Sequence, residues 1–139
     1  MAIIQSFNRF ESKYLLTEEQ KERFVSAVGE HLVKDKYDKY TICNIYYDTP
    51  QNELISRSLE KPVYKEKLRL RSYGVVTPED KVFLEIKKKF KKKVNKRRTK
   101  LKLAEAYAFA ESGELPKHQT YMNAQVMREL QYFLRRMNM

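Results

Sequence analysis

Several residue types are scarce in this sequence of 139 residues, and each shortage excludes a class of site. The one cysteine, Cys43, excludes an intramolecular disulfide and a zinc site built from several cysteines. The two histidines, His31 and His118, are far apart, which argues against a histidine metal cluster. Neither they nor the hydroxyl and thiol residues form a recognisable nucleophile–base pair.

Glycine and long apolar runs are scarce as well. The three glycines, at positions 29, 74 and 113, are too scattered to build a glycine-rich phosphate loop, so phosphates would have to be held by side chains. No apolar run is long enough to span a bilayer, and polar residues follow Met1–Ile4 at once, unlike a signal peptide. We therefore expect a cytoplasmic protein of one domain, with Cys43 as a buried strand residue.

Positive charge is abundant. Lysine and arginine number 29 against 18 acidic residues, for a net charge of +11, while hydrophobic residues make up 42%. That balance is typical of a folded domain. The charge attracts nucleic acid, phosphorylated small molecules, polyphosphate or an anionic membrane surface, and charge alone does not choose among them.

Two segments alternate in the manner of strands with one cationic and one apolar face. In the segment 65–73 the cations and Tyr73 share one face, and Leu68, Leu70 and Ser72 share the other. In the segment 81–87, Val82, Leu84 and Ile86 alternate with Phe83, Glu85 and Lys87. A solvated polar face is the ordinary explanation. If helices cover the apolar sides, the charged sides instead line a concavity suited to a polyanion.

Two further segments extend this pattern. Residues 7–14 place Arg9, Glu11 and Lys13 on one face, and residues 94–103 place Lys96, Arg98, Lys100 and Lys102 on one face. The dense cations between residues 87 and 102 have an alternative interpretation, a solvated hairpin loop. We predict an α+β fold: an antiparallel sheet of four or five strands whose basic face carries Arg69, Arg71, Lys87 and Lys96, with helices on the apolar face.

The remaining segments predict one more strand and four helices. Thr17 and Gln20 form a capping box before a helix that reaches about Leu32, whose stripe of Phe24, Val25, Val28 and Leu32 should cover the sheet. Residues 40–48 predict a strand. The other expected helices begin with Pro50 at the first helical position, run from Ala104 to Leu115 with an interruption at Gly113, and run from Thr120 to about Met137.

The charged residues allow phosphate binding and, less clearly, metal binding. Arg69 and Arg71, two residues apart on one strand, could grip neighbouring phosphate groups with planar forks. Glu11 and Glu85 share faces with the cations and could hold a divalent metal. They could instead be ion-pair partners of the crowded lysines, and the residues alone favour this structural role over metal binding.

Five motifs in order resemble the VTC domain, the polyphosphate polymerase domain of vacuolar transporter chaperone proteins and their bacterial relatives. They are Arg9–Tyr14 (RFESKY), Asn44–Pro50 (NIYYDTP), Lys67–Tyr73 (KLRLRSY), Phe83–Lys87 (FLEIK) and Lys96–Arg98 (KRR). The resemblance implies a triphosphate-tunnel (CYTH-like) barrel of antiparallel strands, with helices packed outside. The first motif reads Arg-x-Glu-x-Lys where the hydrolase branch has Glu-x-Glu-x-Lys, which favours the polymerase branch.

The resemblance also implies roles. Lys13, Arg69, Arg71, Lys87 and Lys96 resemble the catalytic, phosphate-gripping set, with Arg98 as a further substrate-binding residue, and Glu11 and Glu85 match acidic positions that bind Mn²⁺ or Mg²⁺. The implied reaction transfers the terminal phosphate of ATP to polyphosphate. The alternatives are a non-catalytic module that binds polyphosphate or nucleic acid, and a triphosphate hydrolase of the same superfamily. We expect ATP, polyphosphate or triphosphate as partners, and no stable nucleic acid.

Family domains of this kind are longer. The resemblance implies that residues 1–139 are the N-terminal part of a single such domain, without later strands that carry another arginine, the principal metal-binding glutamate and further lysines. We therefore expect an open half-tunnel that binds phosphate-rich anions without polymerising ATP appreciably. Its open sheet edges would permit self-association.

Overall fold

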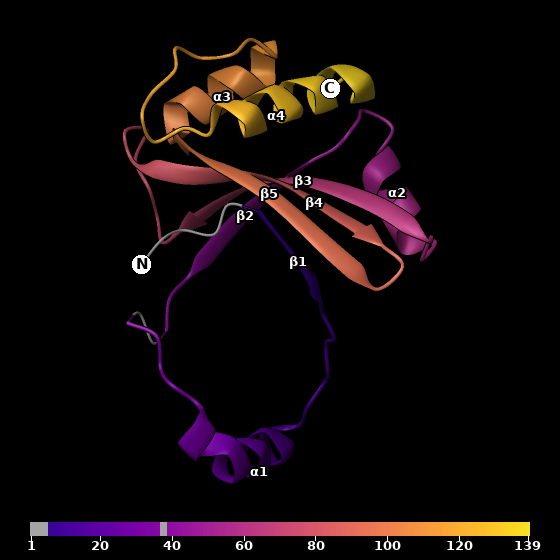
Figure 1. The fold of residues 1–139 in the computed structure, drawn as a ribbon, viewed down its shortest axis with the longest axis vertical. Coiled ribbons are helices and arrows are strands. Elements are labelled where there is room, and N and C mark those ends of the chain that lie inside the picture. The colour runs from indigo at the N-terminus through magenta and orange to yellow at the C-terminus, as the bar shows by residue number, and fades with distance from the viewer. Residues whose placement is uncertain (1–5, 37–38) are drawn as a thin grey trace.

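The structure, a computed structural model, describes residues 6–36 and 39–139, and side chains from Phe10 onward within those ranges. It is an α+β fold, as predicted (Figure 1). The elements are β1 (Ser6–Phe10), α1 (Glu18–Val28), the 3-10 helix η1 (Gly29–His31), β2 (Ile42–Tyr47), α2 (Glu53–Leu59), β3 (Tyr64–Tyr73), β4 (Lys81–Phe90), β5 (Lys93–Lys102), α3 (Leu103–Ser112) and α4 (Ala124–Met137). Among the described helices, none is long and apolar enough to cross a bilayer.

The five strands form one antiparallel sheet in the order β1-β5-β4-β3-β2. The sheet is open, with β1 and β2 as its edges. The central register pairs Lys67 with Lys87 and Lys87 with Lys96, so these cations share one face of three adjacent strands. The segments 65–73 and 81–87 pair as neighbouring antiparallel strands, and their predicted shared basic face is confirmed.

Helices α3 and α4 lie together over the other face of the sheet (Figure 1). The core is formed where inward-pointing strand residues such as Leu68, Leu84 and Leu101 meet Phe109 of α3 and Leu130 of α4, each of which is at most 1% exposed. We call this side the helix-covered face. The buried residues of α4 therefore form a core stripe, which supplies burial that holds the sheet and helices together.

Helix α1 does not cover the sheet, contrary to the prediction. It has the predicted capping box of Thr17 and Gln20, but none of its residues is buried, and Phe24 and Val25 are about half exposed. In Figure 1 it lies at the opposite end of the molecule from α3 and α4. Its segment connects β1 to β2, the two opposite edges of the sheet, and α3 and α4 already occupy the apolar face.

Three local predictions are also corrected. Cys43 is exposed, because β2 is an edge strand that α3 and α4 do not cover. Helix α2 begins at Glu53 and not at Pro50, because Asp48 accepts hydrogen bonds from the backbone N–H groups of Leu54 and Ile55 and so fixes the start there. Strand β1 ends at Phe10, because its partner β5 begins opposite at Lys93.

The run of cations between residues 87 and 102 is mostly strand. Strands β4 and β5 pair along their whole lengths, from Lys81 with Lys102 to Phe90 with Lys93. Only Lys91 and Lys92 form the turn between them, and Lys91 has a positive φ of 52°. The interpretation of this segment as a solvated loop therefore holds for the turn alone.

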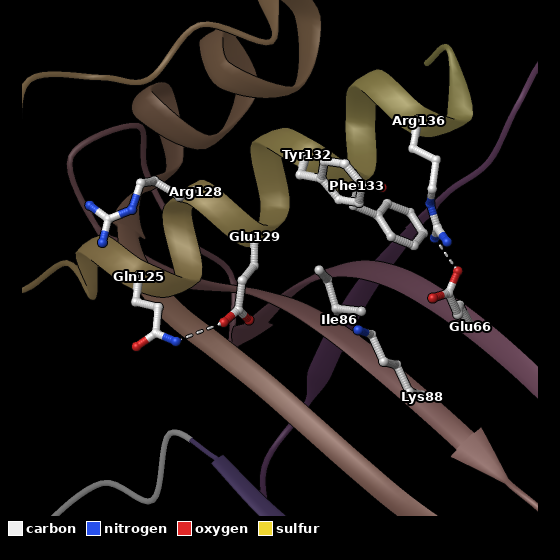
Figure 2. Close-up of a pocket in the computed structure, with 9 residues that line it drawn as sticks. All are labelled: Glu66, Ile86, Lys88, Gln125, Arg128, Glu129, Tyr132, Phe133 and Arg136. Atoms are coloured by element: carbon white, nitrogen blue, oxygen red, sulfur yellow. Dashed lines mark hydrogen bonds and ion pairs between the residues drawn. The ribbon is translucent and has the colours of Figure 1, made fainter.

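Charged pairs join α4 to the sheet along an outer groove, and Figure 2 shows the lining of this groove with one of the pairs, Arg136 and Glu66. Arg97 of β5 donates two hydrogen bonds to the Glu129 carboxylate, at 3.0 and 2.9 Å, and Arg136 pairs with Glu66 of β3. The bond from Arg97 holds the pKa of Glu129 below its usual value. These cations are engaged by carboxylates, so the groove anchors the helix.

We expect replacement of Glu129 by glutamine to lower the free energy of unfolding at pH 7 by about 1 kcal/mol, since a two-bond ion pair at the surface is lost. Because the pKa of Glu129 is lowered by folding, its stabilisation is present above the unfolded-state value of about 4.3 and disappears as the pH falls through the folded value. Urea unfolding between pH 7 and 3 should therefore show a shallower decline for E129Q than for the wild type. The control E111Q, on exposed Glu111, should follow the wild type. If the free energy of unfolding of E129Q declined with pH in parallel with that of the wild type, the stabilising role of the Arg97–Glu129 pair would be contradicted.

Candidate functional site

The sheet surface opposite α3 and α4 is dense in cations, and we call it the cationic face. It carries Lys65, Lys67, Arg69 and Arg71 of β3, Lys87 and Lys89 of β4, and Lys96, Arg98 and Lys100 of β5. The register arranges these side chains in rows across three strands that lie about 4.8 Å apart. One row is Lys67, Lys87 and Lys96, the next is Arg69, Glu85 and Arg98, and the third is Arg71, Phe83 and Lys100.

A buried carboxylate stands at the centre of this face. The Glu85 side chain is 0% exposed, and its Oε2 lies 3.1 Å from Arg69 Nη2 and 3.9 Å from Lys96 Nζ. Arg69 and Lys96 are themselves 9% and 13% exposed. One negative charge therefore offsets only part of the positive charge of two neighbouring cations that are largely removed from water.

Hydrogen bonding at the centre is incomplete. Arg69 Nε, Arg98 Nε and Glu85 Oε1 are buried and have no hydrogen-bond partner. Buried polar atoms in this state raise the energy of the protein, and a ligand or water that pairs with them recovers it. The unpaired N–H groups of these two guanidinium cations are suited to donate hydrogen bonds to phosphate oxygens.

Arg69 also connects the centre to β2. Burial lowers the pKa of its guanidinium, but hydrogen bonds with Tyr46 and Glu85 outweigh that effect and raise it. The Arg69 Nη1–Tyr46 Oη distance is 3.4 Å, and the bond from Arg69 lowers the pKa of the Tyr46 phenol. On the same strand, Asn44 Oδ1 accepts a 2.9 Å hydrogen bond from Arg71 Nε and so orients this second guanidinium.

A cavity of about 360 Å³ lies at one end of the cationic face, which we call the lysine end. Its lining includes Lys13, Lys65, Lys67, Lys87 and Lys89. Burial and the charges of these other lysines lower the pKa of Lys65. Like charges this close repel one another, and a bound anion would relieve this repulsion.

The predicted site residues divide into a central group and a peripheral group. The structure brings Arg69, Arg71, Lys87, Lys96 and Arg98 together on adjacent strands, with Glu85 among them. Glu11, just beyond β1, lies 3.3 Å from Lys87 Nζ, and Lys13 lies 3.9 Å from Glu11 but is 87% exposed. The predicted position of the Arg9 side chain falls outside the described residues.

Both candidate metal ligands are engaged in ion pairs. Glu11 contacts Lys87 and Glu85 contacts Arg69, as the residues alone favoured. Within the described part of the chain, no group of three or more histidine, cysteine, aspartate or glutamate residues could hold a metal. A divalent cation needs several oxygen ligands, and placing one here would break these pairs. The described residues therefore do not fit a metal by themselves, and Mn²⁺ or Mg²⁺ binding stays a prediction.

The site residues predicted from the sequence omit several residues that shape this surface. Tyr46 and Asn44 orient the two arginines, while Lys67 and Lys89 line the lysine end. The alternation of the segment 40–48 could have placed Asn44 and Tyr46 on one face. It could not show that this face lies beside Arg69 and Arg71, because the register is a property of the folded sheet.

We expect E85Q to lower the free energy of unfolding by about 3 kcal/mol at pH 7, because the loss of one charge leaves buried cations without a counterion. The matched control is E79Q. Glu79 pairs with Lys102 at the surface and is 75% exposed, so its loss should cost about 0.5 kcal/mol or less. Urea unfolding of the two variants provides the comparison, and equal small losses would contradict the central role of Glu85.

Comparison with known proteins bears on what this surface binds. Searches of curated proteins and of solved structures found no match. The family model of the VTC domain matches residues 8–139, a range that contains the cationic face and all five motifs of the resemblance. By this match over nearly the whole sequence, the chain belongs to the VTC domain family.

Proposed function

We propose that this is a polyphosphate polymerase-type domain whose cationic face binds the phosphates of ATP and of a polyphosphate chain. In the proposed reaction the terminal phosphate of ATP is transferred to the chain end. Membership of the VTC domain family is consistent with this type of domain. We further propose that the open sheet is one wall of a triphosphate tunnel.

The single observation that carries the proposal is the arrangement of Arg69, Arg71, Lys87 and Lys96. They come from three adjacent strands and point to the face that α3 and α4 leave uncovered. A row of cations at strand spacing matches the repeated charge of a phosphate chain. The outer groove offers a poorer match, because Glu66 and Glu129 already pair with cations there.

Each kind of cation has a distinct task in this proposal. The guanidinium groups of Arg69 and Arg71 offer planar forks that grip and orient phosphate oxygens. The ammonium groups of Lys87 and Lys96 offset the charge that spreads over the transferred phosphoryl group. Catalysis of phosphoryl transfer consists mainly of such placement and electrostatic stabilisation.

Two rival functions share the binding step. A module that only binds polyphosphate or nucleic acid would use the same cations, and the open side of the sheet favours binding without transfer. A triphosphate hydrolase would release phosphate to water. The ligand preference and the product therefore distinguish the three.

We expect the double variant Arg69→Ala, Arg71→Ala to lose at least tenfold in tripolyphosphate affinity, since two charge-assisted contacts are removed. The control Lys91→Ala, in the exposed β4–β5 turn, should change affinity less than twofold. Titration calorimetry at fixed ionic strength measures both, and rising salt should weaken wild-type binding steeply. Single-stranded oligonucleotide should compete poorly; stronger competition by it than by tripolyphosphate would favour a nucleic-acid module.

We expect the 139-residue chain to extend polyphosphate little, if at all, from ATP with Mn²⁺ or Mg²⁺. The reason is that the open sheet contacts the transferred phosphate from one side only. Losing even one preorganised donor typically costs about 3 kcal/mol of transition-state stabilisation. Gel detection of polyphosphate is the assay. Chain growth equal to that of a protein with a closed tunnel would show that one wall suffices, and phosphate release without chain growth would indicate a hydrolase.

A further inference from the structure

An aromatic cluster occupies the end of the cationic face that lies away from the lysine end. We call it the aromatic platform, and it consists of Tyr40, Tyr73 and Phe83. The Tyr40 and Tyr73 ring centroids are 5.6 Å apart and those of Tyr73 and Phe83 are 5.9 Å apart, both pairs edge to face. This geometry fixes the rings relative to one another.

The platform continues directly from the arginine rows. Phe83 lies between Arg71 and Lys100 in the register, and the Arg98 guanidinium carbon is 4.4 Å from the Phe83 ring centroid. Aromatic rings and phosphate-binding cations are therefore neighbours on one surface. A ligand that joins a flat ring to phosphates would contact both.

The platform does not belong to the hydrophobic core. Its rings lie on the face opposite α3 and α4, and Tyr40 and Tyr73 remain 46% and 44% exposed. A hollow of about 740 Å³ adjoins it, lined in part by Tyr40, Ile42 and Asp35. Tyr40 borders this hollow, and the exposed parts of the Tyr40 and Tyr73 rings are accessible for stacking.

The two ends of the cationic face differ in chemistry, which gives the surface a direction. The lysine end offers ammonium groups, the centre offers guanidinium groups, and the other end offers aromatic rings. Four residues of extended strand separate Phe83 from Lys87, about 13 Å. A ring held at the platform and phosphates held at the centre therefore occupy separate positions.

We propose that the aromatic platform stacks the nucleobase of a nucleoside triphosphate, with Tyr73 as the principal contact. The triphosphate then extends from Arg71 through Arg69 toward Lys87. The lysine end binds phosphate groups that carry no nucleobase. This inference rests on the proposed function, because it assumes that the cationic face binds phosphates. It adds a position and an orientation for the nucleotide.

The test compares ATP with tripolyphosphate, which carries the phosphates without a base. Titrations in EDTA-containing buffer use the wild type and Tyr73→Leu, which keeps an apolar side chain and removes the ring. We expect the variant to weaken ATP binding at least about fivefold and to change tripolyphosphate binding less than twofold. Retained tripolyphosphate binding also shows that the variant is folded.

Two further variants sharpen the comparison. Tyr40→Leu should act like Tyr73→Leu with a smaller effect, and Tyr132→Leu, on an exposed tyrosine of α4, should leave both ligands unchanged. Unchanged ATP affinity in Tyr73→Leu, or an equal loss of affinity for ATP and tripolyphosphate, would overturn the proposal that the aromatic platform binds the nucleobase. Failure of the wild type to bind tripolyphosphate at all would instead overturn the proposed function.

Discussion

Like charges repel, and the cationic face sets many of them side by side at strand spacing. The row of Lys67, Lys87 and Lys96 contains no carboxylate. Burial together with the charges of neighbouring lysines lowers the pKa of Lys65. The fold tolerates this because Glu85 is buried between Arg69 and Lys96. A surface with more cations than counterions is costly alone and gains from a bound polyanion.

The opposite face provides the stability that such a surface requires. Side chains that alternate with the cations point into a core shared with α3 and α4, and Leu130 and Phe109 there are almost fully buried. Arg97 and Glu129 join the last helix to the sheet outside that core. Burial on one side of the sheet thus offsets repulsion on the other, which explains why apolar and cationic side chains alternate along the central strands.

Much of the sheet and its cationic face could be predicted from the sequence, because the alternation of residues is local. Arg69 and Arg71 share a face in any strand, and the two-residue period held through β3, β4 and β5. The position of α1 could not be predicted, since it depends on β1 and β2 being opposite edges. The same edge position leaves Cys43 exposed, although its residue type favours burial.

At the candidate site, the contacts between residues of different strands could not be predicted from the sequence. The sequence indicated that Glu85 lies with cations, but it could not distinguish an ion-pair partner from a metal ligand; the described contacts are ion pairs with Arg69 and Lys96. Tyr40, Tyr73 and Phe83 come from three strands or connections, so their contact exists only after the sheet has formed. The local sequence pattern predicts which face of a strand a side chain occupies. The register between strands determines which side chains become its neighbours.

A crystal structure of the protein with tripolyphosphate tests the central claim most directly. The account predicts phosphate groups on the cationic face, in contact with Arg69, Arg71, Lys87 and Lys96. Phosphates that occupy only the outer groove beside α4, or only the exposed turn at Lys91 and Lys92, would contradict it.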